Sequence, residues 1–254
     1  MERLYIRNHS EAASGSSDQG ESVLLFAVLK EEQRKRGVDI PLLAPAYAHG
    51  VWTDTDLMET MALAPDVAAE HFRLATRRML DLVRLFAGTG VDVVGVGGDF
   101  AGNRPLISPA AYRRYIAPEV RAVTDAVHAA GMRAVNASDG NLWSVIEDFL
   151  DGCGVDGYLE IDAQAGMDLG RLKRRFGGRF TLLGNMDCGT LLSFSTEQGV
   201  RDATRECLQA GMNGSPGGHL FCASNAITAS VPPANYRAMI DEYRRFFGLP
   251  PLSL

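Results

Sequence analysis

The chain has 254 residues, 46% of them hydrophobic and 22% charged, and its formal net charge at pH 7 is -6. This length and composition fit a single domain with a sizeable core, and the negative balance excludes the basic surface that is typical of nucleic-acid-binding proteins. No apolar run is long enough to span a membrane, because the run Val23–Leu29 ends at the charged stretch Lys30–Arg36.

Residues Met1–Glu21 are polar, and their second half is rich in serine and glycine, a composition typical of a flexible arm. We therefore divide the chain into an N-terminal arm at 1–21 and a folded domain at 22–254, which begins with a helical pattern over Ser22–Arg36. No signal peptide is recognisable, and the cysteines form no Cys-x-x-Cys pair: Cys153, Cys188, Cys207 and Cys222. These features predict reduced thiols and a cytoplasmic protein.

Six short apolar runs have the length and the β-branched content of buried strands. They are Ile40–Ala46, Val91–Gly97, Met132–Asn136, Gly157–Ile161, Phe180–Leu183 and His219–Ala223. Helical periodicity marks Val67–Phe86, Ala111–Ala130, Leu142–Leu150 and Val200–Gln209. This alternation predicts an α/β fold with parallel strands, and we expect a (β/α)8 barrel of the TIM type that lacks its first two strands. The alternative is an open Rossmann-like sheet, although no G-x-G-x-x-G segment follows any strand.

The strand at Val91–Gly97 is followed closely by Asp99, and Ser108-Pro109 comes shortly after it. Serine before proline is the usual start of a helix, with the serine as N-cap. Because Ser108 supplies that cap, Asp99 is not needed for it and becomes a candidate catalytic residue at a strand end.

Further polar residues follow the other predicted strands, and a barrel brings all such strand ends to one mouth. The candidate catalytic residues are Asp99, Asp139, Glu160 and Asp162, and the candidate substrate-binding residues are Tyr47, His49, Asn136, Ser138, Asn185, Asp187 and Asn225. Glu160 and Asp162 should share one face of their strand, where they could act in acid–base chemistry or anchor an arginine. Helix capping is the alternative role for Ser138, Asp139 and Asp187.

Several segments carry a resemblance when they are taken in chain order. They are GVDVVGVGGDFAGNRPLISPAAYRRYIAPEV from position 90, ASDGN at 137–141, GCGVDGY at 152–158, GNMD at 184–187 and GGHLFCASNAIT with the later VPPANYRAM. This series resembles the uroporphyrinogen decarboxylase superfamily over about residues 40–248. The resemblance implies a (β/α)8 barrel and two branches of function, the haem-pathway decarboxylase and the cobalamin-dependent methyltransferases.

The resemblance implies that the decarboxylase branch binds the propionates of its tetrapyrrole through arginines after its first strand. It also implies an aspartate with a functional role at the end of the second strand. This chain has no matching position for either element. The branch also carries a histidine in its last box, where this chain has Asn225, which hydrogen-bonds but does not titrate near neutral pH. True uroporphyrinogen decarboxylation is therefore disfavoured.

The methyltransferase branch is implied to bind zinc through a His-x-Cys pair and a cysteine in the last box. Alignment on the shared Gly-Asn places this pair at Ala137 and Asp139 and the last cysteine at Asn225. Asp139 is the one plausible metal ligand among these positions, so a Cys/His zinc site is not expected. Cys222 is three residues away and should face the opposite side of its strand.

Three functions follow as hypotheses. The first is a cobalamin-linked methyltransferase-type enzyme that acts on a small substrate, with a corrinoid on a partner protein. The second is a decarboxylase-like lyase of tetrapyrrole metabolism, and the third is a degenerate barrel that binds without turnover. The sequence leaves a divalent metal open as cofactor. Because absent strands leave sheet edges uncovered, we expect a homo-oligomer.

Overall fold

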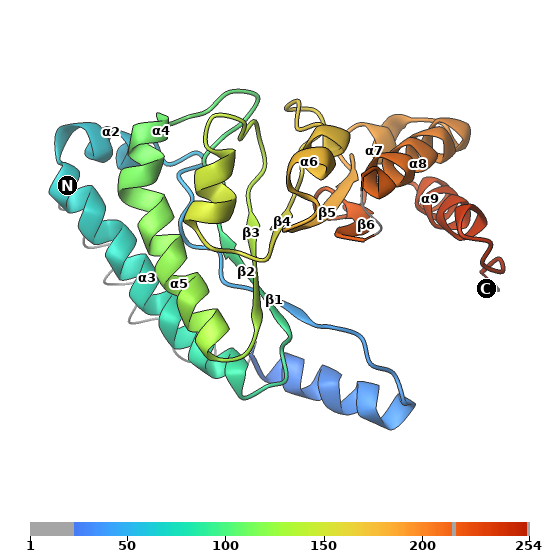
Figure 1. Cartoon of the computed structure of the whole chain (residues 1–254), viewed down its shortest axis with the longest axis horizontal. Helices are drawn as coiled ribbons and strands as arrows, with labels where there is room; N and C mark the ends of the chain where they lie inside the picture. The colour runs from blue at the N-terminus through green and yellow to red at the C-terminus, as the bar shows by residue number, and fades with distance from the viewer. Residues whose placement is uncertain (1–22, 215–216, 253–254) are drawn as a thin grey trace. The chain divides into compact units, whose positions relative to one another are not determined.

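The computed structural model describes residues 23–214 and 217–252 (Figure 1). These residues form two compact units, of which the first comprises the chain up to Ser138 together with Leu142–Asp156, and the second comprises Asp139–Asn141 and the chain from Gly157 onward. The arm expected at 1–21 lies outside the described residues. Within the described part of the chain, no helix has both the length and the apolar character that crossing a bilayer requires.

The first unit is built on three parallel strands in sequence order. These are β1 (Leu43–Pro45), β2 (Val93–Gly97) and β3 (Arg133–Ala137). Leu43 lies opposite Val93, which in turn lies opposite Arg133. The helical elements of this unit are residues 23–36, α2 (Thr55–Leu63), α3 (Pro65–Ala87), α4 (Pro109–Ala111), η1 (Tyr112–Ile116), α5 (Ala117–Ala129) and η2 (Asp148–Gly152).

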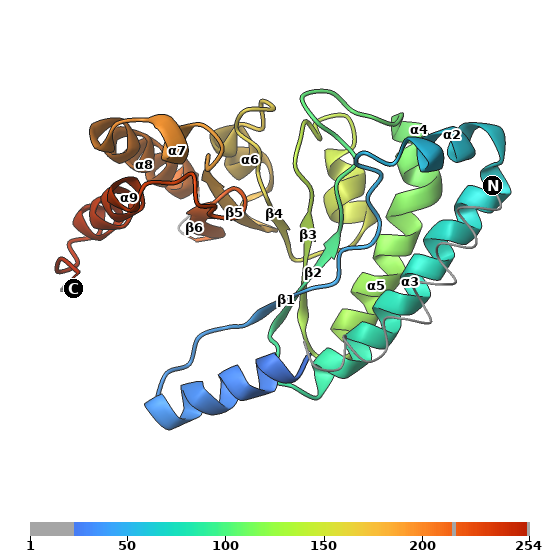
Figure 2. The ribbon, with the colours of Figure 1, turned by 180° about the vertical axis from the view of Figure 1, so that it is seen from behind.

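Helix α3 shows why these sequences fold as they do. Pro65 occupies its first turn, where the missing N–H costs nothing. Phe72, Met79 and Val83 recur at helical spacing and are buried, so they give the helix one apolar face. Helices α3 and α5 run side by side, as Figures 1 and 2 show from opposite directions. The predicted cap is confirmed, since the Ser108 side chain accepts a hydrogen bond from the N–H of Ala111 at 3.1 Å.

The loop that follows β1 runs against the carboxyl end of β2. The N–H of His49 donates to the carbonyl of Gly97 at 2.9 Å, and the N–H of Val51 donates to the carbonyl of Asp99 at 2.7 Å. A Cβ atom on Gly50 would lie 2.8 Å from the Asp99 carbonyl oxygen, a separation that only glycine avoids. Backbone contacts therefore fix both the His49 loop and the residue after β2.

The second unit also has three parallel strands in sequence order, β4 (Gly157–Leu159), β5 (Thr181–Met186) and β6 (His219–Ala223). Its helices are α6 (Leu169–Phe176), α7 (Leu191–Phe194), α8 (Glu197–Met212) and α9 (Pro233–Phe246). Side chains cap two of them, since Asp168 accepts from the N–H of Arg171 and Thr196 accepts from the N–H of Gly199. Helices α8 and α9 pack side by side.

All six predicted strands are confirmed, with boundaries shifted by up to three residues, and their pairing within each unit is parallel. The α/β class is therefore correct. The predicted helices at Val67–Phe86 and Val200–Gln209 are confirmed as parts of α3 and α8.

One helix prediction was correct only in part, the shared face predicted for Glu160 and Asp162 was wrong, and several helices were missed. The helix expected at Leu142–Leu150 begins only at residue 146 and continues as the π-helical turn η2, because buried side chains such as Leu142 and Val145 lie in a turn. Strand β4 ends at Leu159, and Glu160 has a φ of 70°, so strand alternation does not place Glu160 and Asp162 on one face. Helices α2, α6, α7 and α9 were not predicted.

Candidate functional site

A pocket of about 330 Å³ lies in the second unit, beyond the carboxyl ends of its strands. Its wall contains carboxylates, amides and hydroxyls, and none of its lining residues is a lysine or an arginine. The lining residues are Asp139, Asp162, Gln164, Asp187, Cys188, Gly189, Ser224, Asn225, Ala226, Thr228 and Ser230. Four of the predicted site residues therefore meet in one concavity, namely Asp139, Asp162, Asp187 and Asn225.

A hydrogen bond joins two of these residues across 86 positions of the chain. The Asn225 Nδ2 donates to the Asp139 Oδ2 at 2.6 Å, and the Asn225 Oδ1 accepts from the N–H of Ala226 at 2.6 Å. The backbone thus fixes the orientation of the Asn225 amide, which in turn holds the Asp139 carboxylate. Asp139 and Asn225 are two of the three positions that the resemblance aligns with metal ligands of the methyltransferase branch, and here they bind each other.

Asp162 uses its carboxylate to organise the backbone. Its Oδ2 accepts from the N–H of Gly140 at 3.2 Å, and its Oδ1 accepts from the N–H of Ala165 at 3.0 Å. The Asn141 Nδ2 donates to the carbonyl of Ala165 at 2.9 Å. These bonds tie residues 139–141 to the loop that follows β4, and they position the segment that carries Asp139.

Asp187 organises the turn that leads into α7. Its carboxylate accepts from the N–H groups of Gly189 at 2.8 Å and Leu191 at 3.0 Å, and from the Gln164 Nε2 at 2.7 Å. Burial alone would raise the pKa of this carboxyl, but the hydrogen bonds from Thr190, Gln164 and the backbone outweigh it and lower the pKa. The Asp187 carboxylate therefore binds backbone N–H groups, as a capping side chain does, although Thr190 occupies the N-cap position of α7.

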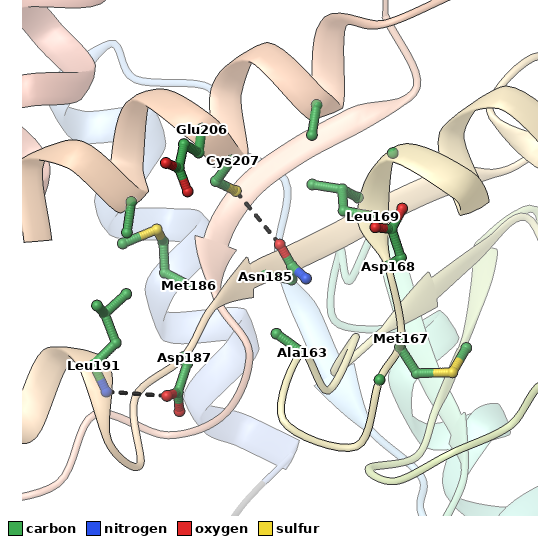
Figure 3. A pocket seen from close by; sticks show the side chains of 14 residues that line it. Ala163, Met167, Asp168, Leu169, Asn185, Met186, Asp187, Leu191, Glu206 and Cys207 are labelled. Atoms are coloured by element: carbon green, nitrogen blue, oxygen red, sulfur yellow. Dashed lines mark hydrogen bonds between the residues drawn. The ribbon is translucent and has the colours of Figure 1, made fainter.

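Asn185 lines a second pocket, of about 520 Å³, beside β5, α6 and α8 (Figure 3). The Cys207 thiol points toward the Asn185 Oδ1 at 3.6 Å. Asp187 lines both pockets, whereas Asn185 does not line the smaller one. Asn185 is thus separate from the Asp139–Asn225 pair, and its binding role stays a prediction.

Of the remaining predicted residues, all but Glu160 belong to the first unit. Asn136 is buried in β3, and its Nδ2 donates to the carbonyl of Phe149 at 2.9 Å, so it acts as a structural anchor. Tyr47 is 39% exposed, and its ring covers Gly95 of β2. Ser138 is fully buried at the end of this unit, and the site roles of Asp99 and Glu160 stay predictions.

His49 was expected to line the mouth of the barrel, but its side chain is fully buried. Its Nε2 lies 2.9 Å from the Thr76 hydroxyl, which donates to the Glu119 Oε2 at 2.6 Å. Because the hydroxyl hydrogen goes to Glu119, Nε2 must carry the imidazole hydrogen, and Nδ1 has no hydrogen-bond partner. Burial, assisted by His71 and Arg78, lowers the pKa of His49 to about 4.

The residues of the pocket do not fit a zinc ion held by thiolates and imidazoles. Among the described residues, no group of three or more His, Cys, Asp or Glu side chains is arranged to hold a metal ion. Asp139 is bound to an amide, and the carboxylates of Asp162 and Asp187 are engaged by backbone N–H groups.

Sequence reasoning missed Gln164, Cys188 and several hydroxyls of the smaller pocket, among them Ser224 and Thr228. Gln164 was detectable in principle, because it follows a predicted strand, as the chosen carboxylates do. The hydroxyls carried no such signal, since serine and threonine are common in loops.

Comparison with known proteins places these features in a family. The family model described as uroporphyrinogen decarboxylase matches residues 41–246. The chain is 31% identical over 108 residues to the uroporphyrinogen decarboxylase of Cupriavidus pinatubonensis, covering 42% of this chain and 28% of that protein. It is 25% identical over 166 residues to the uroporphyrinogen decarboxylase of Thermus thermophilus, covering 65% of this chain and 45% of that protein. The matches therefore span less than half the length of these curated relatives.

Among solved structures, a methyltransferase from Methanosarcina mazei is similar with a TM-score of 0.71 and 18% sequence identity, covering 89% of this chain and 64% of that one. This likeness establishes the fold. The match of the family model over most of the chain, in the same segments that the ordered motifs occupy, shows that this chain belongs to the uroporphyrinogen decarboxylase family.

Proposed function

We propose that this chain is an enzyme of methyltransferase type that acts on a small polar substrate in the Asp139–Asn225 pocket. The observation that carries the proposal is the lining of this pocket, which combines carboxylates, amides and hydroxyls without a cationic side chain. A tetrapyrrole that is held by its propionates needs cations at its binding site. A pocket of about 330 Å³ also lies at the lower end of the usual range for ligand sites, which suits a small substrate.

The chemistry that we propose uses Asp139 as a proton acceptor. A methylated corrinoid on a partner protein would supply the methyl group and keep the electrons of the bond that is broken, and the acceptor would be a substrate X–H bound in the pocket. The Asp139 carboxylate would take up the proton that X loses when X is methylated. Asn225 holds that carboxylate in place through its hydrogen bond.

Methyl transfer is tested with methylcobalamin and a panel of small thiols, alcohols and amines as acceptors. We expect the visible spectrum of methylcobalamin to change in the presence of the protein and one acceptor class, with one methylated product formed per methyl group lost. Release of carbon dioxide from uroporphyrinogen without any methyl transfer would contradict the proposal. It would favour the tetrapyrrole lyase, which the names of the curated relatives support. The absence of both reactions would favour a binding barrel without turnover.

We further propose that the six strands belong to a (β/α) barrel and that the protein is a cytoplasmic homo-oligomer. The support for assembly is an apolar surface on the helix at 23–36, where Leu24, Leu25 and Val28 are 61%, 57% and 62% exposed. The four cysteines carry free thiols, which suits a reducing compartment.

Sedimentation equilibrium is expected to give a dimer or larger species, and Leu25→Glu with Val28→Glu is expected to shift it toward the monomer. Leu63→Glu is the matched control, because Leu63 is 83% exposed at the end of α2, away from this helix in the chain. A monomeric native protein would contradict the proposal, as would equal dissociation by the control variant.

A further inference from the structure

Two adjoining pockets along α8 and α9 form one trench with an unusual composition. One pocket, of about 680 Å³, is lined by Arg201, Arg237, Arg244 and Arg245, and Asp241 is its single acidic lining residue. All of its cationic lining residues are arginines, in a chain whose formal net charge is -6. This local excess of positive charge, opposite in sign to the whole protein, points to an anionic ligand.

The second pocket, of about 600 Å³, shares Arg201, Arg237 and Leu252 with the first. Its other walls are largely apolar, with Tyr236 and Ile240 from α9. The trench thus has an arginine-rich end and an apolar end with an aromatic ring. Arg201 and Arg237 lie where the two ends meet. A ligand that fills both ends carries an anionic head and an apolar or aromatic body.

Two of the trench arginines form ion pairs with carboxylates. The buried Glu242 accepts a hydrogen bond at 2.8 Å from Arg205, which does not line the trench, and its Oε2 lies 3.7 Å from the Arg245 Nη1. The Arg201 Nη2 lies 3.8 Å from the Asp241 Oδ2. These ion pairs reduce the freedom that Arg201 and Arg245 would lose on binding a ligand.

Arg237 differs from its neighbours. Its side chain is exposed, and within the described part of the chain it forms no hydrogen bond or ion pair. A guanidinium group presents paired N–H donors that match two oxygens of a phosphate, and Arg237 has these donors available where the two pockets meet.

We propose that the α8–α9 trench is a binding site for an organic phosphate with an apolar or aromatic body. This is the chemistry that nucleotides and the headgroups of anionic lipids share. The four arginines bind the phosphate oxygens, and Tyr236, Ile240 and Leu252 contact the body. The site is independent of the Asp139 pocket, because the two share no lining residue.

The test is isothermal titration calorimetry of the full chain with three ligands. ATP carries both the anionic head and the aromatic body, whereas pyrophosphate represents only the head and adenosine only the body. We expect ATP to bind more tightly than pyrophosphate and adenosine to bind negligibly. Arg237→Gln is expected to weaken ATP binding about tenfold. The double variant that also carries Arg245→Gln is expected to bind ATP more weakly still. The matched control is Arg84→Gln, which removes an exposed arginine of α3 and should leave binding unchanged. Circular dichroism verifies that each variant is folded.

Vesicles of phosphatidylcholine with phosphatidylglycerol form the second arm. If the protein binds these vesicles but not ATP, and Arg237→Gln abolishes that binding, the phosphate group belongs to a lipid. If the protein binds ATP but not the vesicles, the ligand is a soluble organic phosphate. The proposal is overturned if neither binds, or if Arg84→Gln weakens binding as much as Arg237→Gln does. It is also overturned if a synthetic Glu-rich amphipathic peptide binds to the protein and neither ATP nor the vesicles bind.

Discussion

Replacing Asp139 by asparagine is expected to lower turnover by about a hundredfold or more, the usual contribution of a side chain that moves a proton. Asparagine keeps the size and the polarity of the side chain but cannot take up a proton. The unfolding free energy should change by only about 1 kcal/mol, because the residue lies at the wall of a pocket rather than in the core. The measurements are steady-state kinetics with the acceptor that the methylcobalamin assay selects, and urea denaturation monitored by circular dichroism.

Two further variants separate the role of Asp139 from general effects. Asn225→Ala removes the donor to Asp139 and should lower turnover about tenfold, less than the loss of the carboxylate itself. Asp125→Asn removes an exposed carboxylate of α5 that pairs with Arg121, and it should change neither turnover nor stability measurably. If Asp139→Asn keeps full activity and costs clearly more than 1 kcal/mol, Asp139 is a structural residue.

Acidification from pH 6.5 to pH 4 is expected to destabilise the protein by about 3 kcal/mol through His49 alone. The pKa of this buried imidazole falls from 6.5 to about 4 on folding, so between these values the unfolded chain binds the proton and the folded chain does not. The free energy of unfolding is therefore not reduced by His49 above pH 6.5, and it falls progressively as the pH falls toward 4. The energy follows from about 1.4 kcal/mol for each pH unit.

The free energy of unfolding in urea at several pH values between 7 and 4 measures this slope. His49→Gln is expected to flatten most of it, since glutamine can still donate to Thr76 and does not titrate. Part of the slope should remain, because burial also lowers the pKa of His219. A pH dependence identical in His49→Gln and the unchanged protein would show that His49 is not the group that titrates.

Local sequence patterns were sufficient to predict the strands. Val93–Gly97 and His219–Ala223 form where apolar runs bounded by turn residues indicated them, because strand formation depends on features that span only a few residues. Ser108-Pro109 predicted a helix start for the same reason. Patterning misled at Leu142–Leu150, where apolar spacing reflects burial in a turn.

For the candidate site too, part could be predicted from the sequence and part needed the tertiary structure. The sequence by itself included Asp139 and Asn225 among its candidate site residues, through their place after strands and their match to family positions. The family model confirms the membership on which that match rests. Only the tertiary structure joined them at 2.6 Å, and only it showed that Asp187 binds the turn before α7 and that His49 is buried. Each of these facts depends on residues distant in the chain or on solvent exclusion, which no local pattern encodes.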